Sequence, residues 1–167
     1  MKQLLLFVAL LLVIPASASG KGKVIDIDMT VSGSVLHVSD ARTFYDVDLK
    51  GSPGAANARG AGDGYLADLP DTPCPELEGP DGLKFSTAQV NVVFNDGSMI
   101  YGTVMHDESF VCFAAPIGRA SYEIVGGTGR FEDATGYVVF DLLMHRIESG
   151  SLITPETGIA HGEIILP

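Results

Sequence analysis

Apolar and polar residues alternate along almost the whole chain after residue 23, and this pattern constrains the fold more than any other feature. In "VIDIDMT", Ile25, Ile27 and Met29 are separated by Asp26 and Asp28. A period of two puts successive side chains on opposite faces of a β-strand. The pattern recurs at Thr43–Leu49, Phe85–Phe94, Met99–Met105, Phe110–Ala115, Ala120–Val125, Tyr137–His145 and Ala160–Leu166, and Ser34–Val38 fits a short extra strand. Long helical patterns are absent, so the sequence predicts an all-β fold.

Turn residues lie between the predicted strands. Asn95-Asp96-Gly97 separates two of them and is typical of a β-hairpin. Short strands at regular spacing favour an antiparallel sandwich or barrel. Closing the sheet removes its exposed edges, and about eight strands suit a closed barrel. We therefore expect a single eight-stranded antiparallel β-barrel.

Gly51–Gly82 interrupts the alternation with many glycines, prolines and acidic residues. Ala55–Arg59 fits an irregular strand, whereas Asp63–Gly82 has the composition of a loop. Loops of this length are uncommon inside compact domains. The segment is expected to be either a solvated surface excursion or a lid over the mouth of the barrel.

The first residues have the pattern of a signal peptide. Lys2 precedes an apolar run from Leu4 to Ile14, and Ala16-Ser17-Ala18 supplies small residues at a cleavage site. We expect residues 1–18 to be a signal peptide and residues 19–167 to form the barrel domain of a secreted or periplasmic protein. A retained N-terminal anchor is the alternative. No later stretch is long and apolar enough to suggest a membrane span.

Cys74 and Cys112 are the two cysteines of the chain. In an exported protein such a pair predicts a disulfide, and two separate small apolar side chains are the alternative. The cysteines and the four histidines have no metal-ligand spacing, so no metal is expected. The formal net charge of −11 repels phosphate backbones, which makes nucleic acid an unfavourable partner.

A glycine-rich corner, "GGTGRF", holds Gly126, Gly127 and Gly129. It lacks the Gly-Lys-Ser/Thr of a phosphate-binding loop, and a strand rather than a helix follows it. We interpret it as a structural turn that ends a strand at Val125, with Phe131 tucked beneath the corner.

The stretch around this corner, "YEIVGGTGRFEDATGYVVF", resembles the signature of the dirigent and allene oxide cyclase barrel superfamily. Members have a strand, then Gly-Gly-Thr/Ser-Gly, a Phe two places on and a small-x-Gly start to the next strand. The preceding "FNDGSMIYGTVMHDESFVCFAAPIG" is similar to the hairpin and loop of that family. The resemblance covers residues 85–145, is weaker over 24–60 and is absent over 61–83.

This resemblance implies an eight-stranded barrel with an apolar cavity, often assembled as a homotrimer, that needs no cofactor. Some family members are cyclases that close a ring in an unstable fatty-acid epoxide, and dirigent proteins guide the coupling of phenoxy radicals. Our leading interpretation is a barrel that binds a small apolar molecule in its lumen. The alternatives are a cofactor-free cyclase (an isomerase) or dirigent-type guide, and a structural barrel without ligand.

A cyclising barrel needs polar groups in a dry pocket, because a buried carboxyl group can exchange protons and a hydroxyl can donate to a developing oxyanion. Asp141 is an acid within an apolar strand and shares a face with Tyr137 and His145. That face is either the lumen or the outer surface. The candidate catalytic residues are Asp141, His145 and Tyr122, and the candidate ligand-binding residues are Asp26, Asp28, Tyr101 and Tyr137.

Asp26 and Asp28 occupy a place comparable to the acidic residue that the family's cyclases carry on the first strand. Their alternation with Ile25, Ile27 and Met29 is equally compatible with an exposed face.

Overall fold

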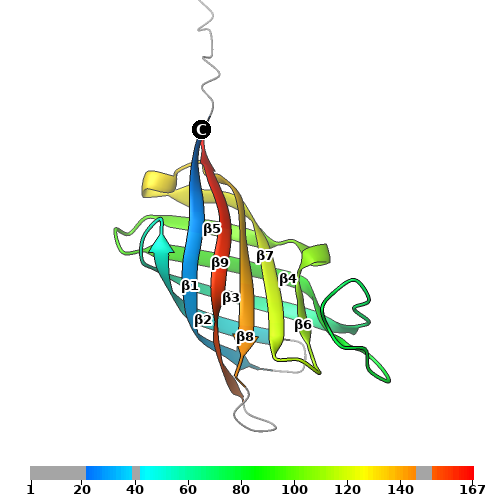
Figure 1. Cartoon of the computed structure of the whole chain (residues 1–167). Helices are drawn as coiled ribbons and strands as arrows, with labels where there is room; N and C mark the ends of the chain where they lie inside the picture. Colours follow the sequence, from blue (N-terminus) through cyan, green and yellow to red (C-terminus); the bar gives the residue numbers. More distant parts are fainter. Residues whose placement is uncertain (1–21, 39–41, 146–151) are drawn as a thin grey trace, which may run out of the picture.

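The computed structural model describes residues 22–38, 42–145 and 152–167. Over these residues the chain forms nine β-strands and two short 3₁₀ helices, η1 and η2 (Figure 1). They are β1 (Lys23–His37), β2 (Arg42–Ser52), β3 (Ala56–Ala67), β4 (Gly82–Phe94), β5 (Met99–Val104), η1 (His106–Glu108), β6 (Phe110–Cys112), β7 (Ile117–Thr128), η2 (Gly129–Phe131), β8 (Thr135–Met144) and β9 (Ile153–Leu166). The prediction of an all-β fold is confirmed.

The strands form one closed antiparallel barrel. Their order is β3-β2-β1-β9-β8-β7-β5-β4, and the additional pairing of β3 with β4 closes the ring. β6 pairs with β4 and β7, the same neighbours as β5. β5 and β6 therefore share one position of the ring, with η1 between them. The predicted eight-stranded barrel is confirmed.

Several strands are longer than the apolar pattern predicts. Ser34–Val38 is not a separate strand, because β1 runs on to His37. The expectation of a loop from residue 63 is wrong at its start, because β3 continues to Ala67 and pairs with both β2 and β4. Ala56 and Ala58 are its buried side chains. Because these inward side chains are small, the contrast between apolar and polar residues along β3 is weak.

The barrel interior is the main hydrophobic core. Inward side chains of every ring position meet there, and removing their apolar surface from water stabilises the closed sheet. The fully buried members include Leu49 of β2, Val90 and Val92 of β4, Ile124 of β7 and Ile164 of β9.

The glycine corner closes one end of this core. β7 does not stop at Val125 but continues through Gly126 and Gly127 to Thr128, and the chain turns at Gly129 with φ of 63°. Glycine adopts this left-handed conformation without steric cost. Phe131 is then completely buried, and its ring centroid lies 4.7 Å from that of Phe94.

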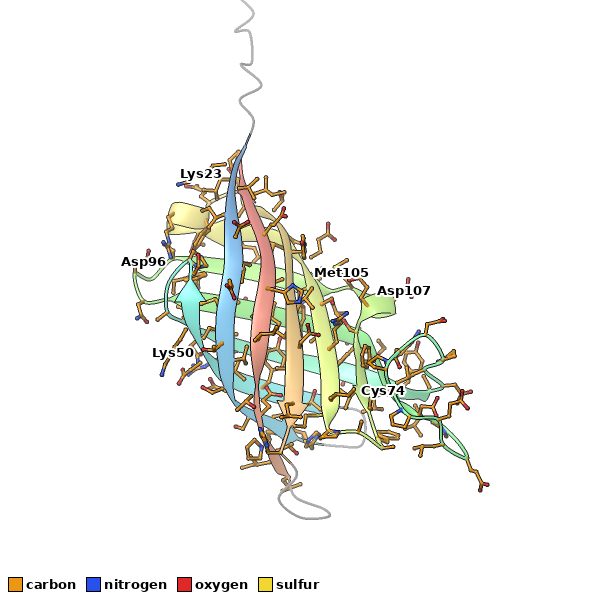
Figure 2. All side chains as sticks on the ribbon, in the orientation of Figure 1. Lys23, Lys50, Cys74, Asp96, Met105 and Asp107 are labelled. Carbon is orange, nitrogen blue, oxygen red and sulfur yellow. A yellow bond between two sulfur atoms is a disulfide. The ribbon has the colours of Figure 1, made fainter. Side chains whose placement is uncertain are left out.

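Arg130 ties the corner to two neighbouring turns. Its guanidinium lies over the rings of Phe131 and Phe94, at 4.5 and 5.1 Å from their centroids. It also forms a 3.0 Å ion pair with Asp96 and donates to the carbonyl oxygen of Pro53 at 3.3 Å. In Figure 2, Asp96 lies toward the end of the barrel that carries Lys23, and Cys74 lies toward the other end. Contacts of Arg130 thus join three turns at the Phe131 end of the barrel.

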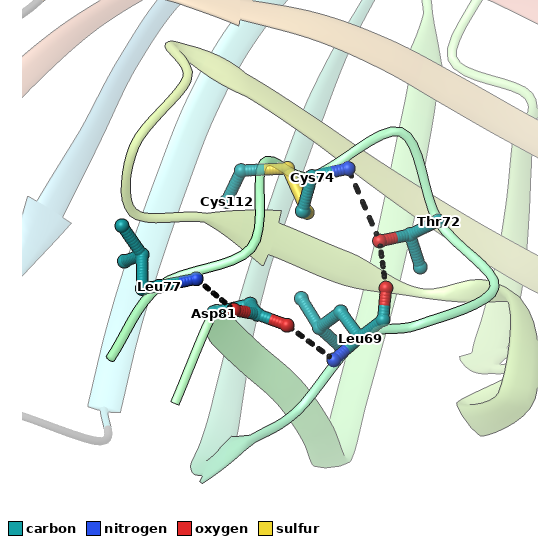
Figure 3. The surroundings of a disulfide bond; sticks show 6 residues. All are labelled: Leu69, Thr72, Cys74, Leu77, Asp81 and Cys112. Atoms are coloured by element: carbon teal, nitrogen blue, oxygen red, sulfur yellow. Dashed lines mark hydrogen bonds between the residues drawn. A yellow bond between two sulfur atoms is a disulfide. The ribbon is translucent and has the colours of Figure 1, made fainter. Parts of the chain in front are cut away.

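The segment between β3 and β4 is fastened to the outside of β6. The predicted disulfide is confirmed: Cys74 and Cys112 are bonded, with their Cα atoms 5.3 Å apart (Figure 3). Asp81 shapes the segment, because its carboxylate accepts from the backbone amides of Leu69 at 3.2 Å and Leu77 at 2.8 Å. Leu69 packs with Phe110 and the disulfide in a second, small core. This anchoring favours the surface excursion over the lid.

Candidate functional site

The barrel interior holds a cavity of about 80 Å³ at the end opposite the glycine corner. Apolar side chains make up most of its wall, and its polar groups come from four strands. The lining residues are Val35, His37, Thr43, Tyr45, Val47, Gly64, Leu83, Phe85, Phe110, Val111, Gly118, Arg119, Ala120, Tyr122, Phe140, Leu142, Met144 and Glu156.

A tyrosine pair crosses the interior from opposite sides of the ring. The hydroxyls of Tyr45 on β2 and Tyr122 on β7 lie 2.9 Å apart, and the Tyr45 hydroxyl lies 3.0 Å from the carbonyl oxygen of Gln89. Tyr45 fits because Gly60 of β3 has no side chain: a Cβ there would stand 1.9 Å from the Tyr45 hydroxyl oxygen. The absence of a side chain at Gly60 of β3 therefore makes room for Tyr45 of the neighbouring strand β2.

The pair can present either a donor or an acceptor to a bound molecule. When Tyr45 donates to Gln89, its oxygen accepts from Tyr122, and the lone pairs of Tyr122 are left for a guest. When Tyr45 donates to Tyr122 instead, the proton of Tyr122 is left for a guest. Burial raises the pKa of Tyr122 to about 12, and the negative charge of Glu156 also acts to raise it. Burial raises the pKa of Tyr45 well above its usual value, so both hydroxyls stay protonated at neutral pH.

Glu156 of β9 is the buried acid of the cavity. Its side chain is 3% exposed, and its Oε2 atom has no hydrogen-bond partner within the described part of the chain. Burial without compensation disfavours a carboxylate, and it raises the pKa of Glu156 to about 7. A group with this pKa can gain or lose a proton near neutral pH, which suits both acid–base chemistry and ligand pairing.

A second polar pair stands next to Glu156 toward the rim of the cavity. Nε2 of His37 on β1 lies 3.2 Å from the hydroxyl of Thr154 on β9. Thr154 and Glu156 are two residues apart on one strand and are both buried. The polar groups of the interior therefore cluster where β1, β2, β7 and β9 face the cavity.

Asp141 lies on the outer surface of the barrel, which is the second of the two alternatives that the alternation left open, so it is not a catalytic group of the lumen. The inward residues of β8 are Val138, Phe140 and Leu142, which pack in the core. Asp141 instead bonds Arg119 at 2.6 Å and His161 at 3.1 Å. Partial burial acts to raise the pKa of Asp141, but these hydrogen bonds hold it below its usual value.

The other predicted site residues, except Tyr122, also have their side chains on the outer surface. His145 is exposed, and its Nε2 lies 2.9 Å from the Thr157 hydroxyl. The remaining four are exposed as well: Asp26 and Asp28 on β1, Tyr101 on β5 and Tyr137 on β8. Apolar neighbours fill the inward faces of these strands. The structure therefore keeps Tyr122 in the candidate site and adds Tyr45 and Glu156.

Glu156 was missed because "TPETG" has the composition of a turn. A usable signal was present nonetheless. Counting back by twos from the apolar Ile164 and Ala160 reaches Glu156 on the same face. Extending the strand pattern would have identified an inward acid.

No family model matches the chain, and no curated protein matches it. Among solved structures, a pterocarpan synthase dirigent protein is similar, with 14% sequence identity, a TM-score of 0.42, and coverage of 89% of this chain and 94% of that one. The barrel itself is established by the strand pairings of this chain.

The described residues contain no helix long and apolar enough to cross a membrane. Within the same ranges, no three His, Cys, Asp or Glu side chains are grouped in a way that could hold a metal ion. The Cys74–Cys112 disulfide is compatible with an extracellular protein.

Proposed function

We propose that this protein is an exported barrel that binds a small, mainly apolar molecule in its lumen. The observation that carries the proposal is the apolar cavity beside Glu156, whose Oε2 atom has no partner. An unpaired buried polar atom costs free energy that a ligand with a matching group would recover. Apolar walls with a few polar groups are typical of small-molecule sites.

The size of the cavity limits the guest. At about 80 Å³ it is smaller than the roughly 300–1,000 Å³ of pockets for drug-sized ligands. The guest is therefore either compact or extends past the rim residues Val35 and Met144. Residues 39–41 and 146–151, which follow β1 and β8 in the sequence, lie outside the described residues.

A cofactor-free cyclase or dirigent-type guide of coupling is the second candidate. Glu156, with its pKa raised to about 7, lines the same cavity as the Tyr45–Tyr122 pair. A carboxyl group with that pKa can act as general acid or base, and a tyrosine hydroxyl can stabilise a developing oxyanion. Holding a flexible substrate close to its reactive shape would lower the entropic part of the barrier.

Paired variants on β8 test the binding proposal. Leu142→Trp puts extra volume into the cavity, whereas Leu143→Trp puts the same side chain on the outer face, where Leu143 is 42% exposed. Mass spectrometry of small molecules extracted from the purified protein is expected to show a ligand with the wild type and Leu143→Trp, and none with Leu142→Trp. A ligand absent from all three proteins, with no thermal stabilisation by added apolar compounds, would support the structural barrel instead.

Export and assembly belong to the same proposal and have separate tests. Residues 1–18, the predicted signal peptide, lie outside the described residues. An intact mass that begins at Ser19 would support their removal. The homotrimer implied by the family resemblance would give three times the chain mass in light scattering.

A further inference from the structure

We propose that the guest of this cavity is an organic ammonium ion with a small apolar body, bound through its N–H groups to the Glu156 carboxylate. The inference rests on the binding function proposed above and names the chemical class of the ligand. It depends on three features of the cavity: its charge, its aromatic walls and its hydrogen-bonding groups.

The charge of Glu156 is not neutralised within the cavity. The other titratable or charged side chains that line it are Tyr45, Tyr122, His37 and Arg119. Arg119 directs its Nε to the outer Asp141 at 2.6 Å. No described side chain donates to Oε2 of Glu156. A buried charge without a partner is costly, so a cationic guest gains more here than a neutral one, and an anionic guest is repelled.

Aromatic rings on several strands surround the same space. Tyr45, Phe85, Tyr122 and Phe140 all line the cavity. The Tyr122 ring lies 6.5 Å from the Tyr45 ring and 6.0 Å from the Phe140 ring, the latter in an edge-on arrangement. The faces of aromatic rings attract ammonium groups and also pack against apolar groups. Both parts of the proposed guest therefore find complementary surface.

The hydroxyl groups of Tyr45 and Tyr122 also favour a guest that donates hydrogen bonds. In the arrangement in which Tyr122 donates to Tyr45 and Tyr45 donates to Gln89, neither bond uses the lone pairs of Tyr122, which are left for a guest. An ammonium group has only donors, so it can use both these lone pairs and the carboxylate. The net charge of −11 adds a long-range attraction for cations.

Three probes that share one ring separate the charge of the guest from its shape. Benzylammonium, benzyl alcohol and benzoate are titrated into the full-length protein and its Glu156→Gln variant by calorimetry at pH 8. We expect benzylammonium to bind the wild type at least about 30-fold more tightly than the variant, since the variant leaves a cation without its partner. Benzyl alcohol is expected to bind both proteins within a few-fold, and benzoate to bind neither.

The pH dependence provides a second measurement that needs no variant. Benzylammonium requires the ionised carboxylate, so its affinity for the wild type should fall by about tenfold per pH unit below pH 7. Tyr45 and Tyr122 remain neutral throughout this range. His37→Gln is the control for the histidine that lines the same cavity, and the fall should persist in that variant.

Two results would overturn the inference. The first would leave the proposed binding function intact, and the second would not. If benzyl alcohol binds at least as tightly as benzylammonium, and Glu156→Gln affects neither, the ligand is not a cation but the lumen still binds small apolar molecules. If none of the probes binds and no extracted ligand depends on residue 142, the binding function itself fails.

Discussion

Glu156 occupies a position where an ionised carboxyl group destabilises the fold. Its pKa is about 7 in the folded protein and about 4.5 when exposed. The folded state therefore binds more protons than the unfolded state between these values. By linkage, the free energy of unfolding falls as pH rises from about 4.5 to 7. Below that window the acid is neutral in both states and has no such effect.

The Glu156→Gln variant is expected to remove the destabilisation that the ionised carboxylate causes. Glutamine has nearly the same shape and no charge, so at pH 8 the variant should be more stable than the wild type by about 3 kcal/mol. At pH 4.5 the two should differ little. Urea denaturation at both pH values measures the difference.

Glu123 provides the matched control for this prediction, because it is a glutamate exposed on the outer face of β7. Glu123→Gln should change stability by at most about 0.5 kcal/mol at either pH. Equal pH profiles for the wild type and Glu156→Gln would show that Glu156 is solvated in the folded protein, contrary to its 3% exposure.

Which acid faces the lumen could be predicted only in part. Asp141 stands among apolar residues on both sides, so alternation alone left its face open. Packing decides it, because Phe140 and Leu142 fill the interior while Arg119 and His161 bind Asp141 outside. These partners come from β7 and β9. A sequence pattern does not show such cross-strand neighbours until the register is known.

At the scale of elements, the glycine corner both turns the chain and closes one end of the barrel core. Phe131 is fully buried against Phe94. Phe131→Ala should lower the free energy of unfolding by about 3–5 kcal/mol, the usual cost of removing a buried aromatic ring. Chemical denaturation measures the loss.

Val125 provides a comparison on the same strand, because it is 52% exposed. Val125→Ala is expected to cost about 0.5 kcal/mol or less. A similar small cost for Phe131→Ala would mean that the corner contributes little to closing the barrel.

The elements that sequence patterns missed share one property. β3 and the first half of β9 have small or polar residues at their inward positions, such as Ala56, Ala58 and Gly158. Strand recognition depends on contrast between apolar and polar residues, and small residues provide little. β4 has bulky inward side chains such as Val90 and Val92, and it was predicted to within three residues of its start and at its observed end, Phe94.

At the scale of the whole molecule, closure leaves no full-length strand edge in the described ring. β3 and β4 would be edges of an open sheet, yet they pair over most of their lengths. Their interior amides should exchange with deuterium as slowly as those shared by β1 and β9, since both ladders then open only with the whole barrel. Hydrogen exchange read by NMR tests this expectation. Faster exchange along β3 alone would indicate that the β3–β4 pairing opens before the rest of the barrel.

The closed barrel was predicted from the number of strands and the cost of exposed edges. The split of one ring position into β5 and β6 was not, because the pattern gives strand order and not which two short segments share a neighbour. The pairings of both with β4 and β7 show this division.

Lys23 and Leu166 are Cα partners in the pairing of β1 with β9. Apart from the β5–β6 division, successive strands along the chain are neighbours in the ring. A short linker between these two residues would therefore make the path circular. New ends could then be cut at Asn95–Gly97, in the hairpin beside Phe94, without changing which strands are neighbours. Lys23, Leu166 and Asn95–Gly97 are not among the residues that line the cavity, so a dye or surface tether attached at any of them would leave the lumen accessible.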